Sequence, residues 1–186
     1  MTLPNWVTLS RLLVLPVLLY CLQTPTTGDR TLSLVLFLVA AMTDWLDGYL
    51  ARKLNAVSEL GKFLDPLVDK LLVTAPVLSL IELQQLPAWG GFLIVARELA
   101  VAGWRVNPHL TGSQAVVGAN LWGKLKTVSQ IAAIALLIAP LPSSWHAPAL
   151  IVFWISVILT LISGAIYFVG ASSKEPGVRE TIEAKG

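Results

Sequence analysis

The chain has 186 residues, of which 55% are hydrophobic and only 13% are charged, and its mean hydropathy is +0.74. Because soluble domains carry roughly 25% charged residues, this composition excludes an ordinary water-soluble globular protein. The net charge of +2 is too small to indicate nucleic-acid binding, and a single cysteine excludes a disulfide scaffold. The composition therefore indicates a membrane protein.

Six apolar runs follow one another along the chain, at residues 6–22, 32–50, 64–82, 88–106, 121–140 and 147–170. A helix needs about 20 apolar residues to cross the hydrocarbon layer, and these runs lack the alternating polarity of barrel strands. The sequence therefore predicts an all-α integral membrane protein with about six transmembrane helices. Since proline is tolerated in a first helical turn, Pro66 predicts that the third helix begins close to Asp65.

Basic residues are distributed unevenly between the predicted loops. They lie between the second and third runs, around the loop that joins the fourth and fifth, and in the C-terminal segment, whereas the intervening loops contain only Arg30. By the positive-inside rule both termini are expected in the cytoplasm. No linker or repeat divides the chain, so we expect one membrane domain over residues 1–171 and a polar cytoplasmic tail over residues 172–186.

Four aspartates lie in or beside the second and third runs. An ionised side chain at bilayer depth costs about 2.5 kcal/mol or more, so such residues suggest a metal, substrate or proton site. Residues three, four or seven apart share a helix face. This spacing groups two acids with small residues on each of two helices: Asp44, Asp47, Gly48 and Ala51, then Gly61, Asp65 and Asp69.

Four carboxylates that face one another would repel, and one or two divalent cations would relieve this repulsion. Oxygen ligands favour Mg²⁺, Mn²⁺ or Ca²⁺ over zinc. Arg52 adds a positive charge beside the small residues, which suits a phosphate. The pattern predicts a metal-assisted diphosphate site at the cytoplasmic side of the bundle. The competing interpretation is a loop of solvated acids balanced by nearby lysines, which does not explain the regular spacing.

The complete pattern resembles the signature of the CDP-alcohol phosphatidyltransferase family. All eight fixed positions agree: Asp44-x-x-Asp47-Gly48-x-x-Ala51-Arg52, then eight residues, then Gly61-x-x-x-Asp65-x-x-x-Asp69. Three shorter segments are similar to those of the members that make phosphatidylglycerol phosphate: Asn5-x-x-Thr8-x-x-Arg11, Ala96-Arg97-Glu98 and Gly123-Lys124-x-Lys126-Thr127. The resemblance covers nearly the whole chain and implies about six helices.

The resemblance implies that glycerol 3-phosphate attacks CDP-diacylglycerol, giving phosphatidylglycerol phosphate and CMP. It implies two divalent cations, Mg²⁺ or Mn²⁺, with Asp69 as the general base, and a location in a bacterial cytoplasmic membrane. The implied metal ligands are Asp44, Asp47, Asp65 and Asp69. The implied CDP-diacylglycerol contacts are Asn5, Thr8, Asp47, Gly48, Ala51, Arg52 and Gly61. The cations suited to the acceptor phosphate are Arg97, Arg105, Lys124 and Lys126.

Several alternatives remain open at this stage. Another acceptor, phosphatidylglycerol or inositol phosphate, would keep the family and change the product. An ion transporter could use the buried acids, although a transport path would spread them across the membrane. Lys124 and Lys126 could serve only topology, and Arg97 could pair with Glu98 instead of substrate. Small residues around Gly164 suit helix packing, which leaves a homodimer through the later helices open.

Overall fold

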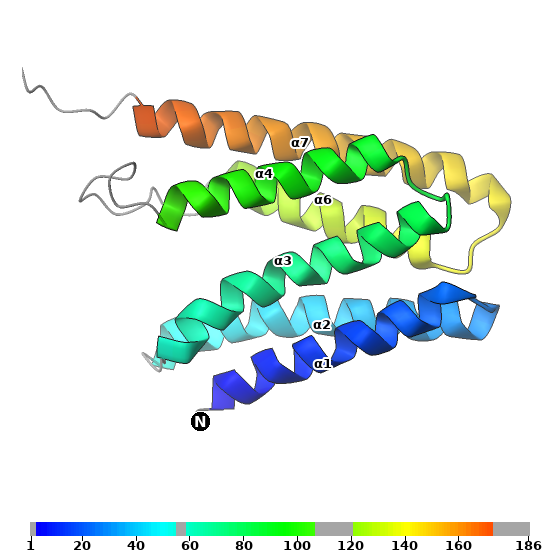
Figure 1. The fold of residues 1–186 in the computed structure, drawn as a ribbon, viewed down its shortest axis with the longest axis horizontal. Helices are drawn as coiled ribbons and strands as arrows, with labels where there is room; N and C mark the ends of the chain where they lie inside the picture. Colours follow the sequence, from blue (N-terminus) through cyan, green and yellow to red (C-terminus); the bar gives the residue numbers. More distant parts are fainter. Residues whose placement is uncertain (1–2, 55–58, 107–120, 173–186) are drawn as a thin grey trace, which may run out of the picture.

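The computed structural model describes residues 3–54, 59–106 and 121–172. These residues form α1 (Leu3–Gln23), α2 (Thr27–Leu54), α3 (Glu59–Glu82), α4 (Ala88–Val106), α6 (Leu121–Ile138), the short 3₁₀ helix η1 (Ser143–Trp145) and α7 (His146–Ser172). Successive helices run in opposite directions along one elongated bundle (Figure 1). The predictions of an all-α fold and of a helix at each of the six apolar runs are confirmed. The predicted tail lies almost entirely outside the described residues.

The predicted start of the third helix is wrong, because α3 begins at Glu59 and Pro66 lies inside it. A proline has no N–H, so the carbonyl four residues earlier loses its usual helical partner. Interior prolines also occur at Pro76 in α3 and at Pro16 in α1. Helices in apolar surroundings tolerate them where neighbouring groups compensate for the lost hydrogen bond. As a result, Gly61 and the two acids after it lie on one continuous helix.

Helix α3 contacts α1, α2, α4 and α6, and α6 contacts α7, α2 and α3. Helix α1 packs against α2 and α3, and α4 packs against α7 and α3. The close approach of α4 to α7 depends on Gly90, where a Cβ atom would lie 2.4 Å from Cε1 of the buried Phe153. The missing side chain at residue 90 therefore sets how closely these two helices can pack.

Polar side chains inside the bundle are paired between helices. Gln130 of α6 donates from Nε2 to Oγ1 of Thr160 in α7 at 2.9 Å, and both residues are buried. Thr160 in turn donates to the carbonyl of Ser156 at 2.7 Å. A buried amide without a partner would cost about 1–3 kcal/mol, so this bridge favours one alignment of α6 on α7.

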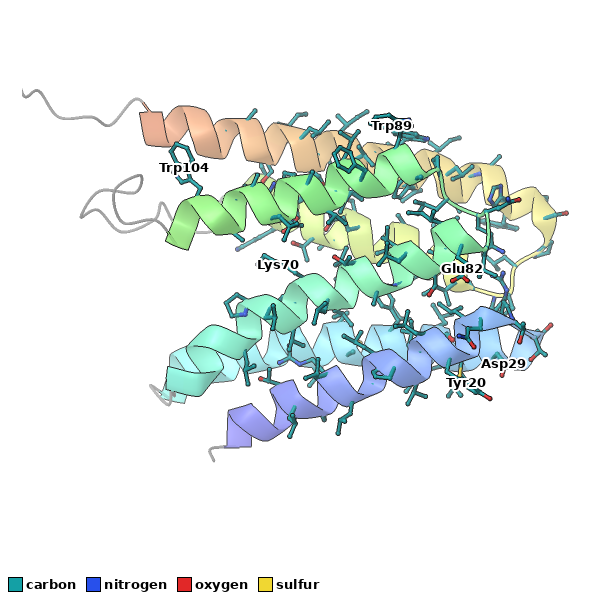
Figure 2. The ribbon with its side chains drawn as sticks, viewed as in Figure 1. Tyr20, Asp29, Lys70, Glu82, Trp89 and Trp104 are labelled. Carbon is teal, nitrogen blue, oxygen red and sulfur yellow. The ribbon has the colours of Figure 1, made fainter. Side chains whose placement is uncertain are left out.

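The outer faces of the helices are strongly apolar. Large exposed side chains occur on all six α-helices, among them Leu13, Tyr20, Met42, Leu78, Phe92, Val128 and Ile151. In Figure 2 Tyr20 extends away from the bundle. Among the described residues, two segments are long and apolar enough to cross a membrane, Leu121–Ile138 and Ser143–Ile166, and a shorter apolar helix covers Thr8–Gln23. An apolar outer surface of this kind suits a lipid environment better than water.

The start of α2 is stabilised by a reciprocal cap. The Asp29 amide donates to Oγ1 of Thr26 at 3.2 Å, and the Thr26 amide donates to Oδ2 of Asp29 at 3.0 Å. The Thr26 hydroxyl also donates to Oδ2 at 2.6 Å. These hydrogen bonds from Thr26 hold the pKa of Asp29 below its ordinary value. The stabilisation is therefore present at neutral pH and is lost as the pH falls through the lowered pKa.

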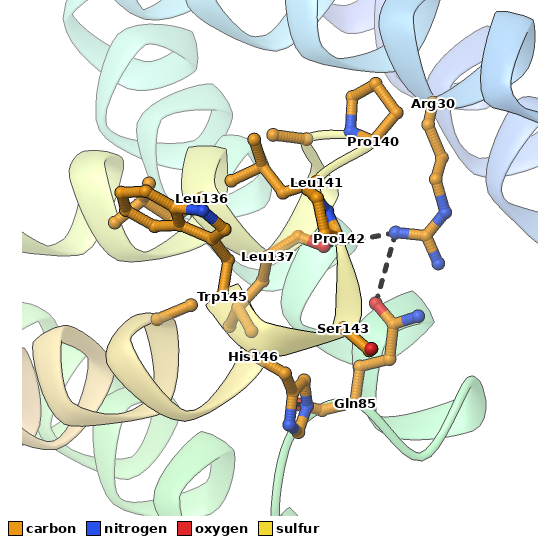
Figure 3. Close-up of a pocket in the computed structure, with 12 residues that line it drawn as sticks. Arg30, Gln85, Leu136, Leu137, Pro140, Leu141, Pro142, Ser143, Trp145 and His146 are labelled. Carbon is orange, nitrogen blue, oxygen red and sulfur yellow. Dashed lines mark hydrogen bonds between the residues drawn. The ribbon is translucent and has the colours of Figure 1, made fainter.

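Arg30 of α2 bonds to the segment after α3 and to the end of α6 at one end of the bundle. Its Nη1 donates to Oε1 of Gln85 at 3.2 Å and to the carbonyl oxygens of Leu137 and Ile138 at 3.2 and 3.4 Å (Figure 3). The last carbonyls of a helix lack intrahelical donors, so Arg30 of α2 caps the C-terminus of α6. A ring nitrogen of His146, the first residue of α7, hydrogen-bonds to the Gln85 carbonyl at 3.1 Å.

Replacing Arg30 by methionine is expected to destabilise the protein while preserving most of the apolar stem. The variant loses charge-assisted bonds to Gln85 and to the end of α6, which contribute about 1–2 kcal/mol at a partly exposed site. Thermal unfolding of the detergent-purified protein should shift down by a few degrees. Arg30→Lys is the matched control, with a smaller shift because it keeps the charge. Equal stability of the methionine variant and the parent protein would contradict the capping role.

Candidate functional site

The sequence motifs come together at the end of the bundle opposite Arg30. The N-termini of α1 and α3 and the C-termini of α2 and α4 all lie at this end (Figure 1). Helices α2 and α3 contact each other and are joined through residues 55–58. The two acid pairs therefore belong to neighbouring helices, in the halves of α2 and α3 that are nearest residues 55–58.

Several predicted site residues lie in helices but have side chains outside the described part of the structure. They are Asn5, Asp44, Asp47, Gly48, Ala51, Arg52, Gly61, Asp65 and Arg105. Their assignments as metal, nucleotide or acceptor contacts stay predictions. The described geometry comes from the remaining predicted residues, which are Thr8, Asp69, Arg97, Lys124 and Lys126.

Helix α1 supplies a buried cation to the last acid of the signature. Arg11 is buried, and its Nη1 lies 3.7 Å from Oδ1 of Asp69 in α3. The Asp69 side chain is 47% exposed, so it is accessible to a ligand. Thr8, one turn before Arg11, is also buried. The ion pair joins α1 to α3 and fixes the Asp69 carboxylate beside α1.

A second charged cluster joins the three later helices. Glu98 of α4 receives hydrogen bonds on one oxygen, Oε1, from Nη1 of Arg97 at 3.2 Å and from Nζ of Lys126 in α6. Nη2 of Arg97 donates to Oγ of Ser163 in α7 at 2.9 Å. The sequence left open whether Arg97 pairs with Glu98, and the structure shows that it does. Lys124, in contrast, is exposed.

Glycine at position 164 makes room for Arg97. A Cβ atom at Gly164 would lie 3.1 Å from Cγ and 3.4 Å from Nε of Arg97. The stem of the arginine therefore lies directly against the backbone of α7. The sequence analysis assigned Gly164 only to helix packing, and no pattern in the chain connects it with a residue 67 positions earlier.

Lys70 approaches the same cluster from α3. It follows Asp69 directly, and it lies close enough to Lys126 for the two ammonium groups to repel each other. Figure 2 shows its side chain on the side of α3 that faces α4 and α6. The Lys70 ammonium itself donates to the carbonyl of Pro66 at 2.9 Å, so Asp69 contacts Arg11 of α1 while the next residue adds a positive charge on the side of Lys126. The sequence analysis did not predict this role; the signal was a lysine directly after the last signature acid.

Comparison with known proteins gives consistent matches. A model of the CDP-alcohol phosphatidyltransferase family matches residues 1–162. The chain belongs to this family. It is 42% identical to the CDP-diacylglycerol--glycerol-3-phosphate 3-phosphatidyltransferase of Bacillus subtilis (strain 168), over 89% of this chain and 93% of the relative. It is 36% identical to the probable phosphatidylglycerophosphate synthase of Mycobacterium tuberculosis (strain CDC 1551 / Oshkosh), over 96% of this chain and 86% of the relative.

A third relative, from Rickettsia typhi, has the same name as the Bacillus protein and is 36% identical over 89% of this chain. Membership of the CDP-alcohol phosphatidyltransferases places the chain in a family of membrane proteins with apolar helices. The eight signature positions therefore match a family to which the whole chain is related, and the match does not depend on a short isolated motif.

The donor chemistry of the signature in this CDP-alcohol phosphatidyltransferase fits a divalent cation. All four candidate ligands are aspartates on two neighbouring helix ends, and carboxylate oxygens are the ligands that Mg²⁺ and Mn²⁺ prefer. Among the residues whose side chains are described, no three His, Cys, Asp or Glu side chains lie close enough together to hold a metal ion. Of the four aspartates, only Asp69 has a described side chain, and this side chain is 47% exposed.

A cavity of about 360 Å³ lies at the other end of the bundle, lined by Arg30, Gln85, Trp145 and His146 among others (Figure 3). It contains none of the signature residues and none of the second charged cluster. The polar groups of Arg30 and His146 already bond to protein atoms there. This cavity is therefore separate from the candidate active site.

Substituting valine for Gly164 is expected to displace Arg97 and destabilise the protein by about 1–3 kcal/mol through overpacking. The measurement is thermal unfolding combined with turnover, which should fall as Arg97 moves away from Ser163. Gly103→Val is the matched control, because it is also a helical glycine but has open space around its Cβ position. If both variants lose equal stability and turnover, the effect of Gly164→Val would come from the lower helix propensity of valine and not from its contact with Arg97.

Proposed function

We propose that the protein transfers the phosphatidyl group of CDP-diacylglycerol to sn-glycerol 3-phosphate, giving phosphatidylglycerol phosphate and CMP. The main support is the intact eight-position signature in a chain that is 36–42% identical to relatives named for this reaction. The described geometry is compatible with it, because α3 supplies an accessible acid, Asp69, and α4 and α6 supply the largely buried cations Arg97 and Lys126.

The reaction is a direct displacement at the lipid-linked phosphorus. A hydroxyl oxygen of glycerol 3-phosphate forms a bond to this phosphorus, the bond from phosphorus to the CMP oxygen breaks, and the hydroxyl proton is released to a base. Divalent metal use is a property of the family, and we propose Mg²⁺ or Mn²⁺ here, held by Asp44, Asp47, Asp65 and Asp69. When bound, two such cations would neutralise the charge that develops on the phosphoryl and departing oxygens.

Asp69 is proposed as the general base that takes the hydroxyl proton. Its side chain is 47% exposed, and its Oδ1 lies 3.7 Å from Nη1 of the buried Arg11, which holds it in place. Arg11 acts here as a positioning residue, since it contacts the base and is not itself assigned to substrate. A carboxylate in this position can contribute a factor of about 10²–10⁴ to the rate.

The remaining signature residues are proposed to bind CDP-diacylglycerol. Gly48, Ala51 and Gly61 would allow the nucleotide to approach the helix backbones closely, and Arg52 would pair with a phosphate. Asp47, Asn5 and Thr8 are proposed as polar contacts; Thr8 is buried beside Arg11. The acceptor's own phosphate is proposed to bind the cations of the later helices: Arg97, Arg105, Lys124 and Lys126.

The protein is proposed to span a bacterial cytoplasmic membrane with all six helices and with both termini in the cytoplasm. The apolar outer faces support this arrangement. The C-termini of α2 and α4 and the N-terminus of α3, which carry several of the basic residues, lie at the end of the bundle that carries the signature. The active site would then open to the cytoplasmic side, where the water-soluble acceptor is present. A homodimer through the later helices stays a prediction.

Purified protein supplied with CDP-diacylglycerol and Mg²⁺ or Mn²⁺ is expected to release CMP when glycerol 3-phosphate is added. EDTA should abolish the release because the carboxylates would lose their cations, and excess metal should restore it. The measurement is CMP formation, with phosphatidylglycerol or inositol phosphate as the acceptor in parallel reactions. Activity with one of these acceptors alone would keep the family and contradict the proposed product.

Asp69→Asn is expected to leave binding of CDP-diacylglycerol largely intact while reducing turnover by a factor of about 10²–10⁴, because the amide cannot accept the proton. Binding is measured as stabilisation against thermal unfolding, and turnover as CMP release. Asp29→Asn, at the other end of the bundle, is the matched control and should keep full activity. Unchanged turnover of the Asp69 variant would remove this residue from the role of base.

A further inference from the structure

The cluster around Glu98 contains more positive than negative charge. Arg97, Glu98 and Lys126 have side chains that are only 12%, 16% and 10% exposed, and Lys70 lies close enough to repel Lys126. Among the described residues, one carboxylate is thus the counter-ion for two largely buried cations, with a third nearby. Burying charges in this imbalance is unfavourable unless further negative charge is supplied.

The donors of the cluster are also incompletely used. Arg97 gives Nη1 to Glu98 and Nη2 to Ser163, but its buried Nε has no hydrogen-bond partner among the described residues. Both cations that contact Glu98 converge on the same oxygen, Oε1. One oxygen of Glu98 therefore accepts from both cations, whereas a ligand with several oxygens, such as a phosphate, could also accept from Nε of Arg97.

We propose that Glu98 is an internal substitute for the acceptor's phosphate. In the empty enzyme its carboxylate neutralises Arg97 and Lys126, and the phosphate of the acceptor replaces it as their partner. This inference rests on the proposed function for the identity of the acceptor. It adds that the binding site is closed by its own counter-ion until a suitable anion competes for the cations.

The exchange provides a basis for acceptor specificity. A phosphate monoester carries nearly two negative charges near neutral pH and has three terminal oxygens, so it can bridge both cations and also reach an unused donor. A phosphodiester, such as the head group of a second phospholipid, carries one charge and offers two free oxygens. Displacing Glu98 costs the same free energy for either acceptor. The monoester offsets more of this cost than the diester does, because it makes stronger contacts with the two cations. Glu98 thus acts as a specificity-determining residue that excludes singly charged acceptors.

The test compares Glu98→Gln with the parent protein and with Glu82→Gln, which removes the same charge from an exposed glutamate at the far end of α3. Thermal unfolding of the detergent-purified protein is titrated with inorganic phosphate at pH 8 and constant ionic strength. The half-saturating phosphate concentration of Glu98→Gln should fall roughly tenfold, which is the size expected for loss of one competing charged contact. The Glu82 variant should match the parent protein.

Kinetics supply the second readout. For Glu98→Gln the KM for glycerol 3-phosphate should fall several-fold more than kcat changes, and the preference over phosphatidylglycerol should weaken. A raised KM, or phosphate binding that is unchanged or weaker, would overturn the proposal and leave Glu98 as a structural partner of Arg97 and Lys126. If the glutamine variant does not fold, Glu98→Asp keeps the charge on a shorter side chain, and its half-saturating concentration should still fall; an unchanged or higher value would overturn the proposal.

The two proposals can fail separately. Absence of CMP release from the parent protein with glycerol 3-phosphate would contradict the proposed function. The phosphate titration does not use turnover, so it still decides whether Glu98 competes with an anion for the two cations.

Discussion

Charged side chains inside an apolar helix bundle must be paired within the protein, and the candidate active site depends on this constraint. Arg11 and the cluster of Arg97, Glu98 and Lys126 are largely buried. In water each charge would be solvated at no cost to the fold, whereas here each needs a partner on another segment. The same contacts that satisfy these charges bring α1 to α3 and join α4, α6 and α7.

The two ends of the bundle meet the constraint in different ways. At the Arg30 end, the guanidinium bonds to the amide oxygen of Gln85 and to the carbonyls that end α6, so its donors serve stability. At the signature end, positive charge exceeds the negative charge of the described residues and a donor of Arg97 is left over. An excess of unsatisfied charge and donors is unfavourable for folding alone and is consistent with a site that binds an anion.

Helix α3 connects the two halves of the proposed chemistry. It carries Asp69, which faces Arg11, and Lys70, which approaches Lys126. Adjacent residues on a helix point about 100° apart, so one helix can present a base to one neighbour and a cation to another. Because α3 runs continuously from Glu59 through Pro66, these two side chains are held by the same rigid element as Gly61. The Asp69 carboxylate, paired with Arg11, and the positive charge of Lys70 are thereby held on one rigid element.

The sequence by itself determined the all-α fold, the six helices and the signature on the second and third of them. This was possible because apolar runs of membrane length and acids spaced by three or four residues are local patterns. The start of α3 was mispredicted because a local rule for proline does not include compensation by neighbouring helices. Only the tertiary structure decided that Arg11 contacts Asp69, that Glu98 lies between Arg97 and Lys126, and that Gly164 makes room for Arg97. Apart from the pairing of the adjacent residues Arg97 and Glu98, these contacts join residues 28–67 positions apart. Such partners depend on how the helices pack and rotate against one another, which no periodicity within a single helix specifies.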